Sequence, residues 1–312
     1  MAAVGREAET LEEIREVGRK EPGYPERLNE LGSAPDPVFL AGRWDHPGPF
    51  VAIVGTRDAS DDGRDVAHDL ARALAERGVA ILSGLARGID AAAHEGALDA
   101  DGVSGAVLGT PLDVTYPREH VSLQDRLRRS LGLMSEIRSG DSTTRNTFAA
   151  RNRMLAALAD VVVVVQGRER SGALLTAKEA RRLGRPVGAV PWDSRDPLGE
   201  APHGLLRSGT GRLVCTVSDV LRLIHPEEDA RSARPYAPRS VTSRVHPELL
   251  ETLQPHERAL YRALRDRPRP MDELAGVSGL TAAQLGVALL SLELQGLARR
   301  DPGGLARRVR RS

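Results

Sequence analysis

Two apolar segments of the chain each end in a turn that could bind an anion. The segments are residues 51–54 and 79–82, and their turns contain Thr56 and Arg57 in the first case and Gly84, Arg87 and Gly88 in the second. Glycines between a strand and a helix let backbone N–H groups converge, and the helix N-terminus adds a partial positive charge. Arginine adds a formal charge and a planar group with several donors. Two such turns, each with an arginine, predict a phosphate site. Neither turn matches the G-x-G-x-x-G or P-loop patterns, so a dinucleotide or P-loop site is not expected.

The same combination follows two later apolar segments. Residues 105–109 lead to Arg118, and residues 161–165 lead to Arg168, Arg170, Ser171 and Gly172. Loops that follow parallel strands meet at one edge of a sheet, where ligands bind. We therefore expect these residues to form one extended phosphate-binding rim. A basic helix predicted over 148–159 adds Arg151 and Arg153.

The order of the elements predicts an α/β fold. Val66, Leu70 and Leu74 recur at helical spacing after the first strand, and Gly78 ends that helix. Further strands are expected at 132–136, 186–190 and 212–215, with helices at 173–183 and 217–224. This pattern predicts an extended Rossmann-like, doubly wound, mostly parallel sheet over residues 47–224. Residues 1–46 are expected to be a short lead-in, with a helix over 9–20 and a strand over 37–40.

A second, smaller domain is predicted at the C-terminus. Residues 225–245 are rich in Pro, Arg and Ser and are expected to be a linker. Three short helical patterns and a hairpin in residues 246–312 then indicate a winged helix. Its third helix, which Thr281 caps, is apolar and poor in basic residues, which favours protein contact over base reading. Arginines of the wing remain available for phosphates in this interpretation; they are Arg299, Arg300, Arg307, Arg308, Arg310 and Arg311.

Composition narrows the functional classes. The chain has 312 residues and a formal net charge of +1, so any basic surface must be local. The single cysteine, Cys215, excludes a disulfide framework and a zinc site built on several cysteines, and we expect no metal and no cofactor. No signal-peptide or membrane-spanning pattern is found, and a cytoplasmic protein is predicted. Aromatic residues make up 3% of the chain, and Tyr116 and Phe148 are the nearby candidates for base stacking.

Several strings resemble the DprA/Smf family of DNA-processing proteins. They are VAIVGTR, SGLARGIDAAAHEGAL, AVLGTPLDVTYPRE, FAARNRMLAALA, VVVVVQGRERSGALLTAKEA and GRPVGAVP, in family order across residues 51–224. The resemblance implies an extended Rossmann fold, single-stranded DNA binding, loading of RecA onto that strand and a role in natural transformation; double-stranded DNA is left open as a further ligand. It places DNA contacts on Thr56, Arg57, Gly84, Arg87, Gly88, Arg118, Ser171 and Gly172. It also implies a homodimer, with Leu206 and Leu213 as contacts.

The chain departs from the family pattern at a few positions. They are Pro111, Ala149-Ala150, Trp192 and Ala201-Pro202-His203. The first two bear on the DNA pocket, and the last two fall near the family's dimer-forming edge.

Two other functions were weighed. A phosphoribohydrolase-like enzyme acting on a nucleotide monophosphate needs a carboxylate over the ribose and a P-G-G-x-G-T turn, whereas residues 170–174 read RSGAL. Asp90 and His94, at i and i+4, are the best acid–base pair, yet a helix N-terminal charge for Asp90 and a packed or surface histidine for His94 are the better explanations. We therefore expect no enzymatic activity and no catalytic residue. A transcription regulator that acts through the winged helix is disfavoured by the apolar third helix.

Overall fold

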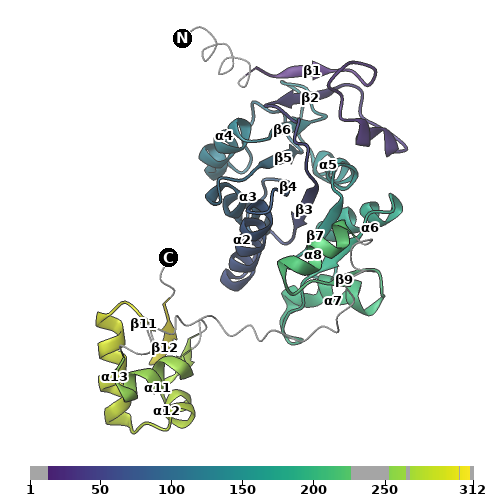
Figure 1. The fold of residues 1–312 in the computed structure, drawn as a ribbon. Helices are drawn as coiled ribbons and strands as arrows, with labels where there is room; N and C mark the ends of the chain where they lie inside the picture. The colour runs from purple at the N-terminus through teal and green to yellow at the C-terminus, as the bar shows by residue number, and fades with distance from the viewer. Residues whose placement is uncertain (1–12, 226–252, 265–267, 302, 310–312) are drawn as a thin grey trace, which may run out of the picture. The chain divides into compact units, whose positions relative to one another are not determined.

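The computed structural model describes residues 13–225, 253–264, 268–301 and 303–309. The chain divides into two compact units, Met1–Ala233 and Arg234–Ser312, which are described separately (Figure 1). All of the predicted linker, residues 225–245, except its first residue lies outside the described residues.

Among the described residues, nine strands form one sheet in the first unit. In spatial order they are β1 (Arg15–Val17), β2 (Val38–Ala41), β6 (Gly132–Ser135), β5 (Ser104–Leu108), β4 (Ala80–Ser83), β3 (Phe50–Val54), β7 (Val161–Val164), β8 (Val187–Ala189) and β9 (Arg212–Leu213). Strands β6 to β9 of this order run parallel, and β1 and β2 are antiparallel. Within the parallel part, the chain begins at the central strand β3, proceeds outward to β6 and returns to β7 on the other side of β3. The predicted mostly parallel, doubly wound sheet is confirmed.

Helices cover both faces of this sheet (Figure 1). One face carries α2 (Asp61–Ala75), α3 (Ile89–Asp99), α4 (Val121–Arg129) and α8 (Val217–Ile224), and the other carries α5 (Arg145–Leu158) and α6 (Ala173–Arg182). Val51 and Ile53 of β3 pack with α2 and α3, whereas Ala52 and Val54 pack with α5 and α6. Because both faces are buried, the strands are continuous apolar runs rather than alternating ones. Shorter elements are η1 (Glu26–Glu30), η2 (Arg118–His120), η3 (Pro197–Gly199) and α7 (Glu200–Arg207).

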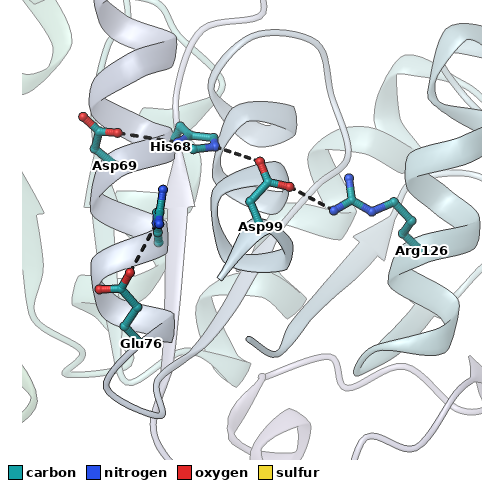
Figure 2. Close-up of polar contacts among 6 residues, drawn as sticks. His68, Asp69, Glu76, Asp99 and Arg126 are labelled. Carbon is teal, nitrogen blue, oxygen red and sulfur yellow. Dashed lines mark hydrogen bonds and ion pairs between the residues drawn. The ribbon is translucent and has the colours of Figure 1, made fainter. Parts of the chain in front are cut away.

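A polar network joins the helices of one face (Figure 2). His68 of α2 lies 3.1 Å from Asp99 of α3, and Arg126 of α4 donates to the same carboxylate at 3.0 Å. These hydrogen bonds, that of His68 first, lower the pKa of Asp99. Asp69 lies 3.6 Å from His68 on its other side. The network ties together three helices that follow successive strands.

The helix predicted over residues 9–20 is wrong where it can be compared. Residues 15–17 form β1, which pairs antiparallel with β2 and buries Val17. Arg15 donates to the carbonyl oxygen of Gly42 at 3.0 Å. Pairing with an existing sheet edge outweighs a weak helical propensity that Gly18 already limits. Residues 1–12 lie outside the described residues.

Other helices and strands begin or end a few residues away from their predicted bounds. The basic helix α5 begins at Arg145 rather than at residue 148, with Thr144 and Thr147 forming a capping box. The strands predicted at 132–136, 161–165, 186–190 and 212–215 are each one or two residues shorter. Such differences leave the register of the sheet unchanged.

The second unit is a winged helix, as predicted. It consists of α11 (Pro255–Ala263), β10 (Arg269–Pro270), α12 (Met271–Ser278), α13 (Ala282–Leu294), β11 (Ala298–Asp301) and β12 (Leu305–Arg308). Its antiparallel sheet has the order β10-β12-β11, and the short strand β10 was not predicted. Thr281 caps α13 by accepting from the backbone N–H of Gln284. Within the described ranges no single helix is long and apolar enough to cross a membrane; only α12 and α13 together, bent by 101°, meet that criterion, by length and composition alone.

Candidate nucleic-acid interface

A cleft of about 880 Å³ opens at the carboxyl ends of the parallel strands. It lies where the strand order reverses between β3 and β7, because the loops after these two strands diverge toward opposite faces of the sheet. Its lining includes Thr56 and Arg57 after β3, Ala86 and Asp90 after β4, Tyr116 after β5, Phe148, Arg151 and Asn152 of α5, and Arg168, Arg170, Ser171 and Gly172 after β7. Five separate segments of the chain therefore meet in one place.

Two buried, oppositely charged side chains form part of the cleft floor. Asp90 and Arg151 are only 6% and 5% exposed. The Asp90 carboxylate accepts from the backbone N–H groups of Gly84 (3.1 Å) and Ala86 (3.4 Å), and Arg151 donates to the carbonyl oxygen of Val107. Burial raises the pKa of Asp90 and lowers that of Arg151, and each charge partly offsets the desolvation of the other. The charge of Arg151 is thus a fixed part of the floor.

Two glycines are required by close contacts beneath the cleft. A Cβ atom added to Gly84 would lie 1.8 Å from Nη1 of Arg151. Gly88 has a φ of +76°, and a Cβ there would lie 2.4 Å from the carbonyl oxygen of Thr56. These glycines therefore let the turns after β3 and β4 and the guanidinium of Arg151 pack against one another.

The mouth of the cleft carries a cation and two aromatic rings in sequence. The Arg57 guanidinium lies over the Phe148 ring, 5.4 Å from its centroid. The Tyr116 ring lies 5.4 Å from that of Phe148, tilted by 54°, and Tyr116 is 51% exposed. Such an arrangement offers aromatic surface for base stacking beside a charge for phosphate.

The rim arginines differ from most other surface arginines in their partners. In the described part of the chain, no carboxylate lies within ion-pair distance of the exposed side chains of Arg57, Arg118, Arg168 and Arg170. Arg87, by contrast, is paired with Glu119, and this hydrogen bond raises its pKa. The four free cations, hereafter the rim arginines, give this edge of the sheet a local positive charge.

The structure brings most of the predicted site residues together. Those that line the cleft are Thr56, Arg57, Arg151, Arg170, Ser171 and Gly172. Those in neighbouring turns, without lining it, are Gly84, Arg87, Gly88 and Arg118. Arg153 is directed elsewhere, to the carbonyl oxygen of Ser33 and to Glu136. Residues two apart on a helix point in nearly opposite directions, so Arg151 and Arg153 cannot both face the cleft.

Sequence reasoning overlooked other lining residues. Asn152 donates to the carbonyl oxygen of Gly172 at 3.4 Å and so links α5 to the start of α6. Leu175 and Thr176 come from the first turn of α6, and Leu175 is 51% exposed. Leu175 and Thr176 could have been inferred from the sequence, because Ser171-Gly172 leads directly into a helix. The first turn of that helix must border any ligand bound at Ser171-Gly172.

His94 is not placed to exchange protons with a ligand in the cleft. It is fully buried and lies outside the cleft lining. Its Nδ1 is 2.8 Å from the Ser104 hydroxyl, which itself donates to the carbonyl oxygen of Ile81 at 2.9 Å. Nδ1 must therefore carry the proton, and burial lowers the pKa of His94 to about 3. Among the described residues no cluster of three or more His, Cys, Asp or Glu side chains could hold a metal ion.

The last strand of the sheet leaves a partly apolar edge. Leu213 of β9 is 56% exposed, and Leu206 of α7 is half-buried against the core. Nearby, two departures from the family pattern compensate for each other: the backbone N–H of Trp192 lies 3.1 Å from Nε2 of His203, and the same nitrogen lies 3.0 Å from the Trp192 carbonyl oxygen.

Comparison with known proteins gives one consistent family. Residues 16–225 match the model for DNA recombination-mediator protein A, and residues 245–304 match the DprA winged helix domain. Protein Smf of Escherichia coli K12 is 35% identical over 291 residues, which cover 91% of this chain and 75% of that protein.

Two solved structures have the same fold. DNA processing protein A (DprA) of Streptococcus pneumoniae superimposes with a TM-score of 0.64 at 36% identity, over 70% of this chain and 77% of that one. DNA processing protein A of Helicobacter pylori, solved in a study of its single-stranded DNA binding mode, gives 0.61 at 25% identity, over 68% and 95%.

Proposed function

This chain belongs to the DprA/Smf family of DNA processing proteins, and we propose that it binds single-stranded DNA in the cleft between the loops that follow β3 and β7. The observation that carries the proposal is the set of rim arginines, four cations without carboxylate partners, three of which line the cleft while Arg118 lies in a neighbouring turn. A polyanion that passes along the rim supplies the missing counter-charges. The Helicobacter pylori relative, which has a described single-stranded DNA binding mode, supports the same ligand class.

The arrangement fits a strand more closely than a free nucleotide. Phosphates lie against Arg57 and the N-terminus of α6, where Ser171 offers a hydroxyl and Gly172 a backbone N–H group. Unpaired bases stack on the Tyr116 and Phe148 rings at the mouth. Charge and stacking are tolerant of base identity, so binding is expected to depend little on sequence.

We propose further that the bound strand is left chemically unchanged. The candidate base His94 is buried and neutral, and the buried Asp90 carboxylate accepts from the backbone N–H groups of Gly84 and Ala86. Family membership supports a role in which the protein loads RecA onto the strand during natural transformation and recombination. It also supports a homodimer, for which Leu213 and Leu206 at the β9 edge are the proposed contacts.

Fluorescence anisotropy with a labelled dT oligomer tests the proposal directly. The full chain and a chain lacking residues 240–312 are expected to bind the oligomer alike, because the rim lies in the first unit. A duplex of the same length, used as competitor, measures the preference for single strands. Loss of binding on truncation would favour a regulator that acts through the winged helix. Absence of binding by both chains, with release of ribose phosphate from a nucleotide monophosphate, would favour the enzyme. RecA filament formation on the bound strand tests the loading step.

A further inference from the structure

The winged helix exposes a continuous apolar face that its own core does not use. Leu285, Ala288, Leu289 and Leu292 of α13 are buried in that core. On the opposite side of the helix, Val287, Leu290 and Leu294 are 62%, 55% and 82% exposed, and Ala283 is also exposed. With about 100° of rotation per residue, these four exposed positions fall within an arc of about 60°. We call them the α13 stripe.

The stripe is unsuited to nucleic acid. No lysine or arginine occurs in α13. The described arginines of the wing have partners within the unit: Arg307 lies 3.0 Å and Arg299 3.9 Å from Asp301, and Arg300 lies 3.5 Å from Glu293. Arg308 is buried and donates to the carbonyl oxygens of Tyr261 and Leu264. Residues 310 and 311, which were also expected to meet phosphates, lie outside the described residues. An apolar partner fits this face better than a polyanion.

We propose that the α13 stripe pairs with the α13 stripe of a second copy of this chain, in antiparallel orientation. The steps between its residues are four, three and four, the spacing of the seam of a coiled coil. The stripe carries no charge, so two identical faces meet without repulsion, as a two-fold symmetric contact requires.

Side-chain size selects the antiparallel orientation. In that orientation Ala283 faces Leu294, and Val287 faces Leu290, so that a smaller residue meets a larger one along the whole seam and the helices stay evenly spaced. A parallel pair would oppose Leu294 with Leu294 at one end and leave Ala283 against Ala283 at the other. Antiparallel helix dipoles add a small favourable contribution.

The area of the stripe indicates a weak contact. Its side chains expose on the order of 400 Å² per copy, about half of what each partner contributes to a stable interface of standard size. The pairing therefore depends on a second contact that keeps two chains together, which raises the effective concentration of one stripe near the other. A homodimer formed elsewhere on the chain, as proposed for the β9 edge, would do so.

Disulfide formation in the full chain tests the pairing. The variant carries Cys215→Ser with Ala283→Cys and Leu294→Cys. These two positions are about 16 Å apart on one straight helix, so a disulfide between them must join two chains. Under mild copper-catalysed air oxidation we expect the monomer band on a non-reducing gel to shift to a dimer.

The matched control places one of the two cysteines at a helix position outside the α13 stripe. Ala282→Cys with Leu294→Cys, in the same Cys215→Ser background, places one thiol about 100° away from the stripe and is expected to stay monomeric. Equal dimer from both variants, or none from Ala283→Cys/Leu294→Cys, overturns the proposal. Efficient cross-linking by Leu294→Cys alone overturns the antiparallel orientation. The proposal is likewise overturned if Leu290→Glu, compared with Ala282→Glu, leaves the yield of disulfide-linked dimer from the Ala283→Cys/Leu294→Cys chain unchanged.

Discussion

The salt dependence of DNA binding follows from the rim arginines. If each of the four neutralises one phosphate, the slope of log K against log salt for a single strand is about −2.8, at ~0.7 per phosphate. Replacing Arg57 and Arg118 by alanine halves the number of such contacts and reduces the slope to about −1.4. Between 50 mM and 200 mM salt, the wild type should then lose about 50-fold in affinity and the double variant about 7-fold.

Anisotropy titrations with a labelled dT oligomer over that salt range measure both slopes. The control is Arg72→Ala/Arg182→Ala, which removes the same charge from two exposed arginines that are paired with Glu76 and Glu179. Both pairs lie on helices of the same unit, so the control separates a specific rim from bulk charge. We expect its slope to match that of the wild type.

Two results would refute the reasoning. If Arg57→Ala/Arg118→Ala keeps the wild-type slope, the strand does not touch these arginines. If the control variant loses as much slope as the rim variant, net charge rather than the cleft governs binding.

Three other predictions concern stability and assembly. The neutral, buried His94, whose folded-state pKa is about 3, stabilises the fold above pH 6.5, and this contribution is lost as the pH falls. Between pH 7 and pH 5, the free energy of unfolding of His94→Asn should therefore decrease by about 2 kcal/mol less than that of the wild type or of a His46→Gln control. Urea unfolding followed by tryptophan fluorescence measures this difference. Gly84→Ala should lower the free energy of unfolding by about 3 kcal/mol, because the added Cβ displaces the buried Arg151 guanidinium from the Val107 carbonyl oxygen to which it donates. A change under ~1 kcal/mol would show that the guanidinium relocates without cost. Leu213→Asp should shift the chain toward monomer in sedimentation velocity, and an unchanged profile would remove the β9 edge as the dimer contact.

Much of the fold could be predicted from sequence because its strands are buried on both faces. A run such as residues 161–165 has few alternatives to a central parallel strand, and Gly167 marks the turn that follows it. The strand β1 at the edge of the sheet was harder to predict from the sequence. Residues 15–17 form a strand only because β2 offers free backbone groups, and nothing local in their sequence records that partner.

The candidate site was predictable by position but not by direction. Strand order brings Arg57, Arg151 and Arg170 to one cleft, since loops after parallel strands share an edge. Whether each arginine is available to a ligand depends on whether it forms an ion pair with a carboxylate, and such pairs join residues that lie far apart in the sequence. Arg153 is held by Glu136 and Arg87 by Glu119, whereas Arg57 remains free. The two-residue step from Arg151 to Arg153 was the one local sign that both could not face the same ligand.

The distribution of acids explains how a nearly neutral chain can present a cationic rim. The chain has 44 Lys and Arg residues and 43 Asp and Glu residues. Many of the acidic residues form ion pairs within or between helices, as Glu76, Glu179 and Asp99 do. Asp58 and Asp90 line the cleft, but among the described residues no carboxylate lies within ion-pair distance of the rim arginines. A DNA strand is therefore attracted to this edge of the sheet more than to other surfaces, because an arginine that is already paired with a carboxylate gains less from a phosphate. In the winged helix, the described wing arginines are likewise paired or buried and the α13 stripe carries no charge, which favours another protein surface as the partner of that unit.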